Sequence, residues 1–184
     1  MFKLFRTKTF TDDWEKMTPL HLTLDTQNAS LCGKPLETGI DAFSFLGKTE
    51  NPKTVNKLET LIYYSLGIAI GFDAKTEKFC DLRIVWDDVS NEGFTPFTGT
   101  LHYGNQTLTS TKKEAIVALL GEPYGSDRDE DEEILFYDTP TVEWQFEFDL
   151  TGNLKQLILN NDPILKDEMQ RESYGITKPW PPKQ

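Results

Sequence analysis

The chain repeats itself at a nearly constant spacing, and this internal similarity restricts its fold more than any other feature. Gly47 corresponds to Gly121, and Tyr63 corresponds to Tyr137, both at an offset of 74. Further apolar pairs follow at slightly larger offsets: Phe72 with Phe148, Leu82 with Leu157 and Leu24 with Leu101. Because a fixed spacing marks a duplicated supersecondary unit, the sequence predicts two copies of one unit, at about residues 22–88 and 99–162.

The length of the chain limits how these copies can be arranged. Its 184 residues, 38% of them hydrophobic, suffice for one globular domain with a packed core. We therefore expect a single compact domain made of four segments. These are an N-terminal segment (1–19), a first repeat unit (20–98), a second repeat unit (99–162) and a C-terminal helix with a proline-rich tail (163–184).

The second copy has the clearer local signals. Gly104-Asn105 favours a hairpin turn, and Thr111 with Glu114 has the spacing of a helix capping box. Gly121 and Pro123 would end the helix. Three strands are expected next, at 133–138, 141–149 and 153–160. The middle one alternates strictly between apolar and polar residues, as a half-buried antiparallel strand does.

The first copy follows the same plan with weaker signals. A short helix capped by Thr38 and Asp41 would end at Gly47, and residues 50–57 read as a polar loop. Strands are expected near 60–65, 67–73 and 79–86. The predicted fold class is therefore α+β, with two tandem helix-plus-antiparallel-meander units that form one sheet with helices packed on one face.

Charge restricts the possible partners. The chain carries 30 acidic and 19 basic residues, and its net charge of −11 argues against nucleic-acid binding, which needs a basic surface. Residues 99–162 alone sum to −9. A concentrated negative charge attracts a basic protein partner. The sequence therefore favours a basic partner for the second copy.

The sequence also suggests a compartment. No stretch approaches the ~18 consecutive apolar residues of a membrane span, and the N-terminal residues have neither the apolar core of a signal peptide nor a lipidated cysteine. We expect a cytoplasmic protein with Cys32 and Cys80 as reduced, small apolar side chains, although the sequence leaves open whether they pair.

Catalytic and cofactor chemistry has no support in the sequence. The two histidines, His21 and His102, occupy different places in the two copies, and neither has a metal-ligand spacing. Phosphate-binding glycine loops and nucleophile motifs are absent, and the acidic run lacks the spacing of a calcium loop. We therefore expect a protein that is not an enzyme and that uses no cofactor or metal.

Two surfaces are candidate binding sites. The first is the polar face of the expected sheet, and the second is the acidic segment 127–133, six of whose seven residues carry carboxylates. Aromatic residues often anchor interfaces, which adds Tyr124 to the candidates. Solvent-exposed sheet and solvated loop are the alternative readings. The candidate partner-binding residues are Asp81, Arg83, Tyr124, Asp127, Asp129, Glu130, Asp131, Glu143, Gln145, Glu147 and Gln156.

A resemblance to a known fold rests on two motifs. These are Leu120-Gly121-Glu122-Pro123 at the helix end and residues 148–154, which read FDLTGNL, between the last two strands. This order resembles the helix-plus-meander unit of the beta-lactamase-inhibitor-protein-like fold, which outer-membrane assembly lipoproteins of the SmpA/OmlA type share. The resemblance covers the second copy closely and, through the repeat, extends loosely over the first. It implies a duplicated scaffold that binds another protein.

Three functions follow from these observations. The leading hypothesis is a non-enzymatic protein-binding module, an immunity or inhibitor protein that neutralises a cognate, basic bacterial toxin. The alternatives are an envelope assembly or scaffold protein of the SmpA/OmlA type and a small-ligand binder that uses a pocket between sheet and helices. The oligomeric state is left open by the sequence.

Overall fold

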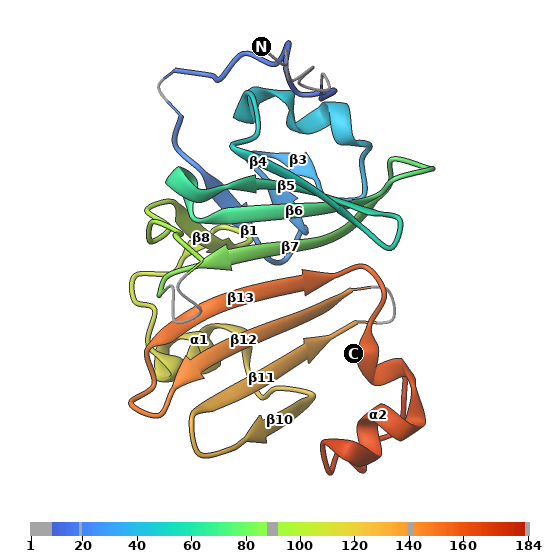
Figure 1. Ribbon diagram of the computed structural model, residues 1–184. Helices are drawn as coiled ribbons and strands as arrows, with labels where there is room; N and C mark the ends of the chain where they lie inside the picture. The colour runs from blue at the N-terminus through green and yellow to red at the C-terminus, as the bar shows by residue number, and fades with distance from the viewer. Residues whose placement is uncertain (1–8, 19, 88–91, 140–141, 183–184) are drawn as a thin grey trace.

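The computed structural model describes residues 9–18, 20–87, 92–139 and 142–182. It shows a mostly β architecture with one sheet of five strands and one of eight (Figure 1). The predicted α+β fold, with helix-plus-meander units in a single sheet, is therefore wrong. Two features explain the difference. Several short segments without a periodic sequence pattern form a second sheet, and the helical segments are short.

The eight-stranded sheet is built from two meanders joined at their last strands. Its order is β10-β11-β12-β13-β7-β6-β5-β4, and all of its neighbours are antiparallel. The bounds are β4 Asn51–Val55, β5 Leu58–Tyr63, β6 Ile68–Asp73, β7 Phe79–Val85, β10 Gly125–Arg128, β11 Glu132–Asp138, β12 Glu143–Asp149 and β13 Leu154–Asn160. The junction pairs β13 with β7, from Gln156 opposite Val85 to Asn160 opposite Asp81.

The five-stranded sheet has the order β3-β2-β1-β8-β9. Its strands are β1 Thr23–Asp25, β2 Ser30–Leu31, β3 Lys34–Pro35, β8 Thr100–Tyr103 and β9 Gln106–Thr107. The central pair, β1 and β8, is parallel, and it joins Thr23 to Thr100 and Leu24 to Leu101. Leu24 and Leu101, which correspond in the two copies of the sequence, thus lie side by side.

In the part of the chain that the structure describes, the helical segments are few and short. They are η1 Ile40–Leu46, η2 Tyr64–Leu66, α1 Lys113–Leu120, η3 Ile164–Lys166 and α2 Glu168–Ser173. The expected capping box at Thr111 is wrong, since Lys112 is the N-cap of α1 and no side chain caps it. Gly121 does end α1, with a φ of 83° that glycine adopts without strain.

The two sheets share one hydrophobic core. It joins Leu24 and Leu101 of the small sheet to Leu61, Leu82 and Phe146 of the large one. Residues of α1 and η1 also belong to it. In Figure 1 the eight-stranded sheet runs from β4 at the top to β10 at the bottom, with β1, β8 and α1 behind it. The opposite face of this sheet, called the outer face below, is turned away from the core.

Several contacts recur at the spacing found in the sequence. The Tyr63 hydroxyl donates to the Gly47 carbonyl, and the Tyr137 hydroxyl donates to the Gly121 carbonyl, each at 2.9 Å. Each meander also has one register shift, beside Phe72 and beside Phe148. Equivalent glycines therefore receive equivalent hydrogen bonds in the two copies.

Three further expectations can be compared with the structure. Residues 50–57, expected as a polar loop, contain the edge strand β4. The acidic segment 127–133, also expected as a loop, contains the end of β10 and the start of β11. Cys32 and Cys80 are free thiols. Among the residues that the structure describes, no helix is long and apolar enough to cross a bilayer.

Candidate functional site

The sequence predicts that the outer face is open to a binding partner. For Glu143 this prediction is wrong, because the C-terminal segment covers its side chain. The Glu143 side chain lies on that face but is 0% exposed. Its carboxylate accepts hydrogen bonds from the backbone N–H groups of Ile164 and Leu165, at 2.9 and 3.3 Å, and from the Asn160 amide. Glu143 therefore holds the C-terminal segment on the sheet and is not accessible to a partner.

The other predicted residues on this face form a partly buried polar cluster. Gln156 lies between Arg83, whose Nε donates to it at 2.7 Å, and the carboxylate of Glu147, to which its amide donates. Burial raises the pKa of Glu147, which is only 7% exposed. Burial also raises the pKa of Asp81. Gln145 donates to Glu143, and Arg83 also forms an ion pair with Glu92, so the cluster is bonded both internally and to neighbouring residues.

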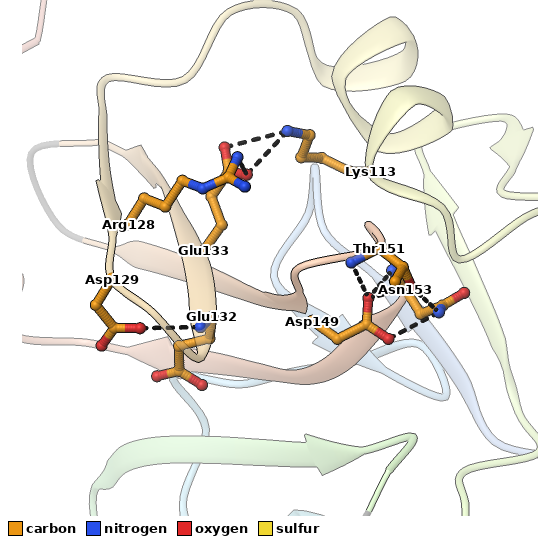
Figure 2. A network of polar contacts seen from close by, with 8 residues as sticks. All are labelled: Lys113, Arg128, Asp129, Glu132, Glu133, Asp149, Thr151 and Asn153. Atoms are coloured by element: carbon orange, nitrogen blue, oxygen red, sulfur yellow. Dashed lines mark hydrogen bonds and ion pairs between the residues drawn. The ribbon is translucent and has the colours of Figure 1, made fainter.

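The acidic segment forms the hairpin of β10 and β11. Asp129 accepts the backbone N–H groups of Asp131 and Glu132, at 2.8 and 2.9 Å, and so shapes the turn. These bonds lower the pKa of Asp129. At the hairpin, the Glu133 carboxylate is paired with Lys113 of α1 and with Arg128 (Figure 2).

The exposed charge of the hairpin is concentrated at its tip. Asp129, Glu130 and Asp131 are exposed, and Asp127 is half-buried. Glu132 is paired with Lys155 and points back to the sheet. The expected acidic surface is therefore present at the four predicted residues, on a hairpin with defined turn geometry and not on a free loop.

A cleft lies where the small sheet, the end of α1, the base of this hairpin and the C-terminal tail meet. Its volume is about 580 Å³, within the usual range of ligand-binding clefts. Aromatic and proline side chains form much of its wall. The lining residues are Thr26, Gln27, Tyr103, Leu120, Glu122, Pro123, Tyr124, Tyr137, Asp138, Thr139, Trp144, Lys178, Pro179 and Pro182.

Tyr124 is the predicted residue that joins this cleft. It packs with Phe136 and Leu165 on the outer face, and its ring meets that of Trp180 edge-on, with centroids 5.8 Å apart. Its hydroxyl donates to the Lys178 carbonyl at 2.9 Å. Tyr124 therefore fastens the tail beside the cleft.

A second groove adjoins the cleft on the other side of residues 122 and 123. It lies between α1 and the hairpin, and Glu122 and Pro123 line both hollows. Val117 and Leu135 give it an apolar floor, and carboxylates of α1 and β11 contribute to its rim. The two hollows therefore lie on either side of Glu122 and Pro123, next to the acidic hairpin.

Asp138 is the unusual residue of the cleft. Both of its carboxylate oxygens are buried, and neither has a hydrogen-bond partner among the residues that the structure describes. Burial, reinforced by the nearby Glu143 carboxylate, raises the pKa of Asp138 to about 8. Such a group is neutral at neutral pH and ionises when a cation approaches.

Sequence reasoning missed Asp138 and the cleft. Asp138 ends a strand and is followed by a turn, where an aspartate is ordinary. The cleft combines residues from positions 26 to 182. One signal was available: an acidic residue at the end of an apolar strand, at the position that corresponds to Tyr64, breaks the similarity of the two copies.

Comparisons with known proteins give little help. No family model and no curated protein matches this chain. Among solved structures, a DUF4309 family protein (YjgB) from Bacillus subtilis subsp. subtilis str. 168 is 17% identical with a TM-score of 0.44. That alignment covers 68% of this chain and 80% of the other. At this TM-score the likeness supports no inference, and the resemblance to the inhibitor-like fold stays a prediction.

Proposed function

We propose that this chain is a non-enzymatic protein-binding module of the immunity or inhibitor type, which neutralises a basic bacterial toxin domain. The observation that carries the proposal is the cleft beside the acidic hairpin. Pro123 and Tyr124 line the cleft and directly precede β10. At the other end of the hairpin, Tyr137 and Asp138 end β11 and also line the cleft. One element therefore joins an aromatic hollow to an exposed acidic tip.

The dimensions of this element suit a single protein partner. The short strand β10, Gly125–Arg128, rises about 13 Å, so that the cleft and the tip lie within one interface of ordinary size, about 800 Å² on each partner. Aromatic side chains in a hollow provide anchoring contacts. Carboxylates at the rim speed the approach of a basic protein and select against acidic ones.

A site-specific photo-crosslinker tests the location of the surface. We would place it at Tyr103, which lines the cleft, and as a control at Val55. Val55 is 61% exposed on β4, at the opposite end of the eight-stranded sheet from β10. In cells that produce the protein, the Tyr103 position should capture a basic protein that the Val55 position does not.

The captured protein then tests the function. Produced alone it should stop growth, and co-production of this chain should restore growth. Reversal of Glu130 and Asp131 to lysine should slow association strongly at low salt, because both carboxylates are exposed at the tip. Capture of the same proteins from both positions, or an association rate that is unchanged by the reversals, would count against the proposal.

A small-ligand binder is the second candidate, because the volume of the cleft alone would hold a small organic molecule. A thermal-shift screen tests it. A compound that stabilises the protein, and whose effect disappears when Tyr103 is replaced by a bulky tryptophan, would support this reading. A cross-linked protein partner at Tyr103 would favour the first.

A further inference from the structure

Asp138 is a buried carboxyl group without a hydrogen-bond partner among the described residues. It is the last residue of β11 and lies opposite Glu143 in the register of β11 and β12. An unpaired buried polar group destabilises a fold by about 1–3 kcal/mol. A buried carboxylate that lines a cleft, and that bonds to none of the described residues, therefore indicates a site whose occupant is not part of this fold.

The cationic side chains Lys178 and Arg171, near the cleft, are hydrogen-bonded to backbone carbonyl groups. The Lys178 ammonium donates to the Pro123 carbonyl at 3.1 Å. Arg171, close enough to influence the pKa of Tyr124, donates to the carbonyls of Leu165 and Lys166 at 2.8 and 2.9 Å. Neither positive charge is bonded to the Asp138 carboxyl.

The acidic neighbours of Asp138 favour a cation further. Glu143 faces it from β12, and its carboxylate already accepts bonds from the C-terminal segment. Glu122 is exposed at the rim of the cleft. Tyr124 faces the group from the segment before β10 and is neutral, because burial raises the pKa of its hydroxyl. The carboxyl groups beside Asp138 therefore favour a cation at this point of the cleft.

The walls of the cleft select among cations. Tyr103, Tyr124, Tyr137 and Trp144 provide ring surface. A guanidinium group is planar, stacks on aromatic faces and can bond a carboxylate through two parallel N–H groups. An ammonium group is more strongly hydrated and gains less from such walls. An alkyl-guanidinium therefore fits both the rings and the carboxyl.

We propose that the cleft receives the guanidinium of an arginine side chain and that the Asp138 carboxylate binds it. This deepens the proposed function, on which it rests, by naming the group that a basic protein partner inserts. The oxygens of Asp138 are covered in the unbound form. Binding therefore requires the carboxyl to turn toward the cleft or the tail wall, formed by Lys178, Pro179 and Pro182, to shift.

Binding would release a proton from the protein. Because the pKa of Asp138 is raised to about 8, the carboxyl is mainly protonated below that pH, and its proton passes to solvent when the guanidinium pairs with it. The apparent affinity falls with the fraction of ionised Asp138. Between pH 9 and pH 6 this fraction drops about a hundredfold, whereas a guanidinium stays charged throughout.

The test uses butylguanidinium as the probe and butylurea as its uncharged counterpart of the same shape, with affinities measured by NMR titration of the intact chain. We expect butylguanidinium to bind at pH 9 and to weaken by about a hundredfold at pH 6. Butylurea should bind weakly and equally at both. Asp138→Asn should lower the affinity for butylguanidinium at pH 9 by about thirtyfold or more, as the loss of a buried charged partner does.

The matched control is Asp41→Asn, which removes an exposed carboxylate of η1 that does not line the cleft. It should leave the affinity unchanged. Equal affinity for the two probes, or butylguanidinium binding that survives Asp138→Asn, would overturn the inference. Because no protein partner is needed, a failure here is separate from a failure of the cross-linking. Binding of the probe without any captured protein would assign the same cleft to a small guanidinium compound.

Discussion

Replacement of Asp138 by asparagine should stabilise the protein, and the gain should grow with pH. Asparagine keeps the shape of the carboxyl but cannot ionise. In the folded chain the pKa of Asp138 is raised from 3.8 to about 8, chiefly by burial. A raised pKa means that the folded state holds a proton that the unfolded chain has already lost. The free energy of unfolding is therefore not reduced by Asp138 below about pH 4, and it declines as the pH rises from there to about 8.

The structure bounds the size of this effect. Each unit of pKa difference corresponds to about 1.36 kcal/mol at most, so that linkage alone would allow about 4 kcal/mol at pH 7. Asp138 is only half-buried as a residue, and solvent screening reduces the figure. We expect Asp138→Asn to gain about 1–3 kcal/mol at pH 8, comparable to the cost of an unsatisfied buried group.

Urea unfolding at a series of pH values measures this gain. The curves of wild type and Asp138→Asn should coincide near pH 4 and separate up to pH 8. Burial also raises the pKa values of Asp81 and Glu147, but both groups are present in both proteins and cancel in the difference. A constant offset between wild type and Asp138→Asn, or a loss of stability that grows with pH, would refute the reasoning.

Three further changes test the scaffold. Tyr137→Phe removes the 2.9 Å hydrogen bond to the Gly121 carbonyl and should lower the free energy of unfolding by about 0.5–1.5 kcal/mol in urea titrations; no change would mean that water replaces the bond. Gly67→Ala should destabilise by more than about 2 kcal/mol in the same assay, because φ is +68° and the added Cβ would lie 2.6 Å from the Thr95 carbonyl oxygen, while Gly33→Ala, at φ +72° with open space around it, should lose clearly less. Asp149→Ala should be less stable than the wild type at neutral pH, because hydrogen bonds from Asn153 and Thr151 hold the pKa of Asp149 well below its usual range. The stability that these bonds contribute is lost as the pH falls through that low pKa, so the difference between the two proteins should shrink in acid. An acid titration followed by circular dichroism in which the difference stays constant would contradict this.

The parts of the fold that sequence predicts are those with a local cause. The alternation of Trp144 and Phe146 with polar residues is sufficient to identify β12, since side chains alternate along any strand. Gly121 ends α1 because a positive φ is needed there. Strands β5, β6, β7, β11 and β13 lie within a few residues of their expected positions for similar reasons.

Most of the second sheet has no such local cause; the exception is the hairpin of β8 and β9, which turns at Gly104-Asn105 as the sequence predicts. Strands β2 and β3 are too short for any period, with Ser30–Leu31 in one and Lys34–Pro35 in the other. In the eight-stranded sheet, the edge strand β4 presents the same difficulty: it begins with Asn51-Pro52 and is mostly exposed, so its sequence is that of a loop. Strands β1 and β8 become partners only because the chain returns to β1 after completing the whole first copy. Pairing over such distances depends on the whole fold: the sequence shows that Leu24 and Leu101 correspond, but it does not show that their strands pair.

The candidate site shows the same division. Alternation correctly places Glu143 and Glu147 on the face away from the core, but it says nothing about what covers that face. The C-terminal segment does so, through the two backbone N–H groups that Glu143 accepts at Ile164 and Leu165. A polar residue on an outward face suggests, from the sequence alone, a contact with a partner. Here Glu143 instead binds the chain's own C-terminal segment.

The similarity of the two copies shows where binding should be sought. Position 64 of the first copy corresponds to position 138 of the second, and the strand registers on either side agree, with Asn51 opposite Ile62 and Gly125 opposite Phe136. In the first copy the position holds Tyr64, which accepts a 2.9 Å hydrogen bond from Asn51 and packs against Phe94 at 5.1 Å.

The first copy thus fills this place with its own side chains. In the second copy it holds Asp138, which is buried beside a cleft and bonds to none of the described residues. The backbone differs at this point, since Tyr64 begins η2 whereas Asp138 ends β11, but only in the second copy does the side chain at this position lack a bond to any described residue. The departure is therefore best explained by an external partner, and the guanidinium titration of wild type and Asp138→Asn measures directly whether the carboxylate binds one.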